Sequence, residues 1–195
     1  MKIFKKAIWL LAVTGILSGH ACSSDTGEEP TKENPKSEFP TELTGNWMDS
    51  WSWFMQYNFD PLLYDPDAKV WFRGSYDAWS MDPRPGFGLQ IDQSGNFIWT
   101  VVVSTNTGGC QVYTAEYLKG TVEITASKIT FHPKVRRKKY HSVCNPGNNF
   151  DRDEDKGSFS LTFKITDGES YNGHEVKVLT LINPDGSEVA YSQTK

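Results

Sequence analysis

The sequence predicts an all-β protein built as an up-and-down antiparallel barrel of about eight to ten strands. Nearly every segment after residue 40 alternates apolar and polar residues with period two, and no long amphipathic helix is present. The connections between these segments are short, so neighbours in sequence are expected to be neighbours in space. One-sided apolar faces at this spacing fit a barrel or a sandwich, and a barrel leaves no exposed sheet edge.

The first strand is expected from residue 45 to 54, and another near residues 70–76. Residues 87–91 and 97–103 predict the clearest hairpin, because their apolar side chains alternate on either side of a turn cluster at 92–96. Further strands are expected at residues 111–118, 122–126, 129–131, 159–166, 175–183 and 188–193.

The N-terminus has the composition of a signal peptide, expected to span residues 1–21. Three lysines precede an apolar run over residues 7–17, and small residues lead up to Cys22. The run is too short for a transmembrane helix, which needs about 20 apolar residues. Cys22 in this position resembles the lipidated cysteine of a bacterial lipobox. The alternative is an ordinary signal peptide followed by an unrelated cysteine.

Residues 22–40 are expected to form a lipidated, disordered tether, and residues 41–195 the barrel domain. The tether is rich in Ser, Glu, Lys, Asn and Pro, a composition that cannot bury apolar area. Its acidic beginning, residues 23–29, resembles the surface-export signal of Bacteroidetes lipoproteins. The expected location is therefore the outer membrane, on its periplasmic face or at the cell surface. Acidic linkers also occur for solubility alone.

Charge and cysteine content narrow the possible partners. The formal net charge is −4, and removing three lysines with residues 1–21 gives −4 − 3 = −7. This acidic balance gives no electrostatic reason to expect nucleic-acid binding. With Cys22 lipidated, Cys110 and Cys144 remain, and in an oxidising compartment we expect them to form a disulfide. Two free thiols are the alternative.

Three motifs resemble the lipocalin-like lipoproteins of Bacteroidetes. Residues 43–47, Leu-Thr-Gly-Asn-Trp, resemble the Gly-x-Trp opening of lipocalin and calycin barrels. Residues 117–131 resemble the middle hairpin of these lipoproteins, and residues 179–191 their closing hairpin. The resemblance implies a lipocalin-like up-and-down barrel in which the first-strand tryptophan packs near the closed end.

Aromatic residues are concentrated between positions 47 and 79, where we expect the ligand site. Trp47, Asp49, Trp51 and Trp53 share one strand face, and a carboxylate among tryptophans favours a cavity with a polar group over a plain core. The alternative is that the rings fill the barrel. The apolar triplet Leu62, Leu63 and Tyr64 lies in a long loop that is expected to lid the barrel mouth, or to form an Ω-loop packed on itself.

Two charged segments have weaker functional interpretations. Residues 151–155 carry carboxylates at alternate positions but depart from the EF-hand pattern, so a solvated acidic loop is expected and no metal site is predicted. Residues 134–139 are basic on both strand faces, which fits a protruding hairpin arm or an edge strand. This run is expected to be solvated, to pair with residues 151–155, or to bind an anionic glycan or headgroup.

No catalytic motif or cofactor-binding motif is present, so we expect neither an enzyme nor a cofactor. The first functional hypothesis is a lipid-anchored protein that captures a small apolar or amphipathic ligand in its barrel. The alternatives are a surface glycan-binding lipoprotein, with Trp53, Tyr57 and Trp79 as exposed rings, and an accessory subunit with an outer-membrane protein partner.

Overall fold

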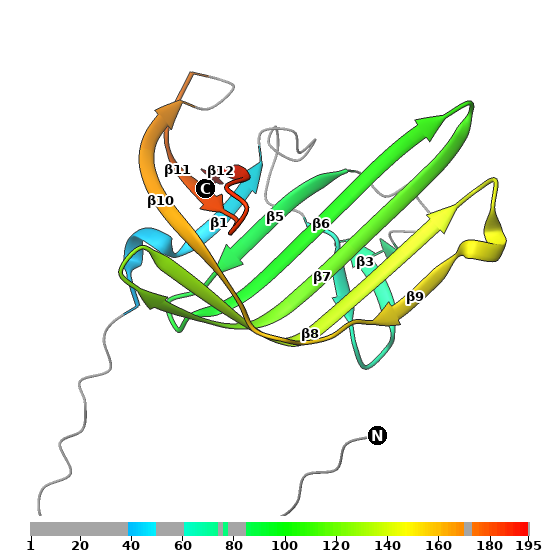
Figure 1. Ribbon diagram of the computed structural model, residues 1–195, viewed down its shortest axis with the longest axis horizontal. Coiled ribbons are helices and arrows are strands. Elements are labelled where there is room, and N and C mark those ends of the chain that lie inside the picture. Colours follow the sequence, from blue (N-terminus) through cyan, green and yellow to red (C-terminus); the bar gives the residue numbers. More distant parts are fainter. Residues whose placement is uncertain (1–38, 50–60, 74–75, 78–84, 170–172, 195) are drawn as a thin grey trace, which may run out of the picture. The chain divides into compact units, whose positions relative to one another are not determined.

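In the computed structural model, the described residues are 39–49, 61–73, 76–77, 85–169 and 173–194 (Figure 1). Within them, eight antiparallel strands form a closed barrel in the order β10-β11-β12-β1-β5-β6-β7-β8, and β8 pairs again with β10. The strands are β1 (Gly45–Asp49), β5 (Gly86–Ile91), β6 (Asn96–Thr107), β7 (Cys110–Thr125), β8 (Lys128–Ser142), β10 (Phe159–Glu169), β11 (Glu175–Ile182) and β12 (Glu188–Thr194). The predicted all-β, up-and-down barrel is confirmed.

The barrel interior is filled by its own side chains. Phe131 packs edge-on against Phe97, with ring centroids 5.0 Å apart, and stacks on Phe159 at 5.1 Å. Trp47 is fully buried and donates its indole N–H to the carbonyl oxygen of Leu43, at 3.0 Å, in the short 3-10 helix η1 (Thr41–Leu43). The cluster of buried residues comprises Leu43, Trp47, Leu89, Ile91, Phe97, Leu118, Ile129, Phe131, Leu161, Leu179, Leu181 and Tyr191.

A second, three-stranded sheet contains β2 (Leu63–Asp65), β3 (Val70–Arg73) and β4 (Tyr76–Asp77). The strand expected near residues 70–76 therefore exists, but it pairs within this small sheet and not in the barrel wall. Leu62, Tyr64 and Trp71 pack against Val102, Ala115 and Tyr117. Because strand side chains alternate between faces, and Leu118 points into the barrel, Ala115 and Tyr117 lie on its outer face. The small sheet thus covers the outside of the barrel.

Strands β6, β7 and β8 continue past the closed part of the barrel (Figure 1). Strand β5 pairs with β6 only as far as Val102, whereas β6 and β7 stay paired to the turn between Thr107 and Cys110. On the other side, β9 (Phe150–Asp153) pairs with β8. We call this extension, made of residues 103–107, 110–116, 136–142 and 150–153, the wing.

The basic run at residues 134–139 lies in β8, which pairs with β7 and, at residues 137–140, with β9, so this part of the run is not an edge strand. Residues 136–139 belong to the wing, which fits the expected protruding hairpin. The expected break at Gly120 is a register shift between Lys119 and Gly120 within the single strand β7. The 3-10 helix η3 (Pro146–Asn148) connects β8 to β9. The predicted disulfide is confirmed: it joins Cys110 to Cys144 near the wing tip, with Cα atoms 5.6 Å apart.

Candidate functional site

A cavity of about 530 Å³ lies at one rim of the barrel, beside strands β1, β5, β6 and β12. Strand β1 is described as far as Asp49 and the chain again from Pro85, so the cavity borders residues outside the described part of the chain. Its lining residues are Asp49, Pro85, Gly86, Phe87, Val102, Val103, Ser104, Glu188, Val189 and Ala190.

The lining combines apolar walls with a few polar groups. Phe87, Val102, Val103 and Val189 supply the apolar surface. Asp49 is buried and its Oδ1 accepts the backbone N–H of Phe87 at 3.2 Å, which fixes the carboxylate where the β1–β5 pairing ends. This mixture of apolar surface with a few fixed polar groups is typical of small-ligand sites.

Next to the cavity, the packed interior contains a hydrogen bond between two aromatic side chains. The indole N–H of Trp99 donates to the hydroxyl oxygen of the buried Tyr191 at 3.1 Å. Burial raises the pKa of Tyr191, the hydrogen bond from Trp99 opposes this, and the charge of Asp49 raises the pKa further. Tyr191 is thus neutral at physiological pH.

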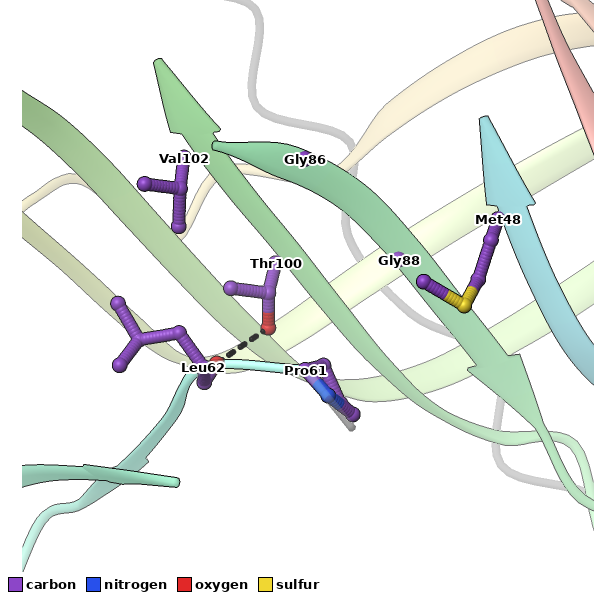
Figure 2. Close-up of a pocket in the computed structure, with 7 residues that line it drawn as sticks. All are labelled: Met48, Pro61, Leu62, Gly86, Gly88, Thr100 and Val102. Carbon is purple, nitrogen blue, oxygen red and sulfur yellow. Dashed lines mark hydrogen bonds between the residues drawn. The ribbon is translucent and has the colours of Figure 1, made fainter. Parts of the chain in front are cut away.

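The predicted lid residues lie elsewhere. Leu62 crosses the outer face of β6, where its carbonyl oxygen accepts the Thr100 hydroxyl at 2.8 Å (Figure 2). A space of only about 10 Å³ remains between this segment and β5, where Gly86 and Gly88 present no side chain. That is roughly the volume of one water molecule, too small for an organic ligand. The placement of Leu62, Leu63 and Tyr64 over the barrel mouth was therefore wrong; they anchor the small sheet to the barrel wall.

This anchoring also depends on a polar contact. The indole N–H of Trp71 donates to Oδ2 of Asp151 at 3.0 Å, and Oδ1 of Asp151 accepts from Arg137 at 2.6 Å. The guanidinium of Arg137 lies over the Tyr64 ring, 5.2 Å from its centroid. The predicted pairing of the basic run with residues 151–155 is thus confirmed, and it serves to dock the small sheet.

One of the predicted ligand residues lies at the rim cavity. Asp49 lines the cavity, and Trp47, on the same strand face, is part of the filled interior. Trp51, Trp53, Tyr57 and Trp79 lie outside the described residues, as does Cys22. Sequence reasoning placed Phe87 and Val103 on inward faces but missed their role, because alternation does not show that β1, β5, β6 and β12 meet at one rim.

In the described part of the chain, no three His, Cys, Asp or Glu side chains are grouped so as to hold a metal ion. None of the helices there is long and apolar enough to cross a membrane. No family model matches the chain, and no curated protein or solved structure matches it significantly. Fold and site together define a closed up-and-down β-barrel with a cavity at its rim.

Proposed function

We propose that the protein is a non-catalytic binding protein that holds a small apolar or amphipathic ligand in the rim cavity. The observation that carries this proposal is the cavity itself, whose volume of about 530 Å³ lies within the usual range for small-molecule sites. The apolar part of a ligand fits against Phe87, Val103 and Val189, and a polar end fits near Asp49 and Ser104.

Attachment to the outer membrane through a lipid on Cys22 is part of the same proposal. It is supported by the apolar run that precedes Cys22 and by the polar tether that follows it. The barrel would then reach its ligand, or a membrane-protein partner, from the end of a flexible link. Mass spectrometry of the N-terminal peptide of the mature protein tests this proposal. Lipid attached to Cys22 would raise the mass of this peptide by the mass of its acyl groups and glycerol. An unmodified Cys22 would rule it out.

Calorimetric titration with dodecanoate and with its neutral glycerol ester tests the binding proposal. The side chain of Val103 lines the cavity and is 42% exposed, so Val103→Trp fills space without disturbing a tightly packed core. We expect this substitution to weaken binding by about tenfold or more, since a ligand loses roughly 0.8 kcal/mol for each methylene group left in water.

Val143→Trp is the matched control, because Val143 is 62% exposed and does not line the cavity. Its affinity should equal that of the unaltered protein. Equal affinities for the Val103→Trp and Val143→Trp proteins would contradict the rim site, and no saturable binding of either ligand would contradict the proposed function.

A further inference from the structure

The inner face of the wing, which continues the alternation of the barrel interior, carries two aromatic rings. Tyr140 of β8 and Phe150 of β9 are cross-strand partners. Their rings are nearly parallel, with 17° between the planes and 5.8 Å between the centroids. Both side chains are half-buried, and the next residue across the sheet, Thr114 of β7, is small. The wing therefore presents aromatic surface that the barrel core does not cover.

Two cations face each other in the adjacent row of the same face. Lys138 and Arg152 are cross-strand partners, which brings their Cβ atoms to about 5 Å from each other. Like charges directly opposite each other destabilise a sheet. Among the described residues Lys138 forms no ion pair, and Arg152 uses only its Nε, which donates to Glu154 at 2.9 Å. The Arg152 guanidinium lies over the Phe150 ring, 4.4 Å from its centroid, and the side chain is 61% exposed.

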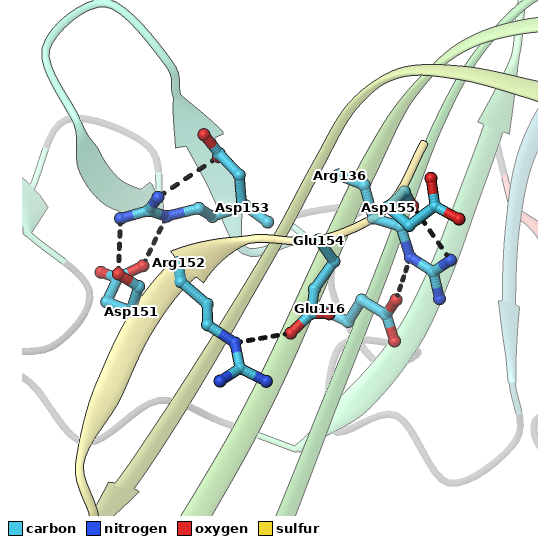
Figure 3. Close-up of polar contacts among 8 residues, drawn as sticks. Glu116, Arg136, Asp151, Arg152, Asp153, Glu154 and Asp155 are labelled. Atoms are coloured by element: carbon cyan, nitrogen blue, oxygen red, sulfur yellow. Dashed lines mark hydrogen bonds and ion pairs between the residues drawn. The ribbon is translucent and has the colours of Figure 1, made fainter. Parts of the chain in front are cut away.

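The charges of the wing separate by face (Figure 3). On the outer face Arg137 is neutralised by Asp151 and Asp153. On the inner face Arg136 pairs with Glu116 at 2.7 Å and also donates to the backbone carbonyl oxygen of Asp155 at 3.3 Å. Lys138 and Arg152 are the inner-face cations with donors that no described contact uses.

Three of these cations influence the pKa of Glu154. It is lowered first by the hydrogen bond from Arg152, and also by the charges of Lys138 and Arg136. These three cations therefore lie close together on a chain whose formal net charge is −4.

We infer that the inner face of the wing binds an acidic oligosaccharide. Because the Arg152 guanidinium already lies over Phe150, the apolar C–H face of a pyranose ring packs against Tyr140, whose neighbour Thr114 is small. A sugar carboxylate bridges Lys138 and the two Nη atoms of Arg152, which no described contact uses. A bridging anion relieves the repulsion between the two opposed cations. Flat aromatic surface beside paired cations matches a ring that carries its own carboxylate better than it matches an isolated phosphate. This site is separate from the rim cavity and does not depend on the proposed function.

Calorimetric titration of the full-length protein in mild detergent, with hexagalacturonate and with the neutral cellohexaose, tests the inference. We expect saturable binding of hexagalacturonate that weakens as salt is raised, and little binding of cellohexaose. Lys138→Gln should weaken hexagalacturonate binding by about tenfold, the loss of one charge-assisted contact. Tyr140→Leu should weaken it as well.

The thermal stability of the variant shows whether Lys138 acts in binding or only in holding the structure together. Because Lys138→Gln removes a like-charge contact, the thermal midpoint of the free protein should stay the same or rise while its affinity falls. Lys134→Gln is the matched control, since Lys134 is exposed in the same basic run and lies outside the opposed pair; its affinity should not change. The inference would be overturned if hexagalacturonate did not bind, or if cellohexaose bound equally well. It would also be overturned if Lys138→Gln left the affinity unchanged, or if the protein bound only phosphatidylglycerol vesicles.

Discussion

At the scale of single residues, Gly120 shows how little room separates two barrel strands. The register shift between Lys119 and Gly120 brings the β8 backbone against this position. A Cβ atom there would lie 2.9 Å from the Cα of Pro133 and closer still to the carbonyl oxygen of His132. Both are backbone atoms in a paired strand, so they cannot turn away as the end of a side chain can.

Gly120→Ala should therefore lower the free energy of unfolding by about 1–3 kcal/mol or more, the usual cost of forcing extra volume into a packed site. Urea denaturation gives this value. Gly147→Ala is the control, because a Cβ at Gly147 would meet only Oδ1 of Asn145, at 3.9 Å. If the two variants lose equal stability, crowding by β8 is not what requires a glycine at position 120.

At the scale of elements, the small sheet is held against the barrel partly by Tyr117, which is buried beneath it. Burial raises the pKa of Tyr117 from 10.0 to about 12, and the charge of Asp65 adds to the shift. Between pH 10 and 12 the unfolded chain loses a proton that the folded protein keeps, so unfolding becomes easier as pH rises through this window. Below pH 10 the stabilising effect of the neutral tyrosine is fully present.

Tyr117→Phe should accordingly make the loss of stability between pH 10 and 12 shallower, while leaving stability at neutral pH nearly unchanged. Urea unfolding followed across this pH range measures the slope. Part of the fall should remain, because burial also raises the pKa of Tyr191. An unaltered slope in Tyr117→Phe would mean that Tyr117 ionises with its ordinary pKa in the folded state.

The elements also show what alternation in the sequence can and cannot predict. The inward faces of the hairpin at residues 87–103 follow directly from period two, because one buried face requires it. Alternation does not say which strand lies beside which. Arg137 and Asp151 are 14 positions apart, and only the β8–β9 register makes them partners on one face. For the same reason the lid was misplaced: Leu62 and Tyr64 were recognised as apolar, but their partners Val102 and Ala115 are distant in the sequence.

At the scale of the whole molecule, the barrel is closed by pairing the first strand with the last. Asn46 lies opposite Thr194, and Asp49 opposite Tyr191. This closure joins residues more than 140 positions apart in the chain, so its entropic cost is high. The short connections that the sequence predicted explain why the strands between them follow in order. The rim cavity combines residues of β1, β5, β6 and β12, which only the assembled barrel brings together.

The disulfide reduces this cost by acting on the unfolded chain. Cys110 and Cys144 are 34 positions apart, and a loop of that size restricts the unfolded state by about 3–4 kcal/mol on the chain-entropy estimate. The double substitution Cys110→Ala with Cys144→Ala should lower the free energy of unfolding by that amount. It should also steepen the dependence on urea, because an unfolded chain without the cross-link exposes more surface. A reducing agent should produce the same change in the unaltered protein and none in the double variant. If the double variant keeps its full stability, the cross-link does not stabilise the protein. Residual strand pairing from β7 to β9 would then already restrict the unfolded chain.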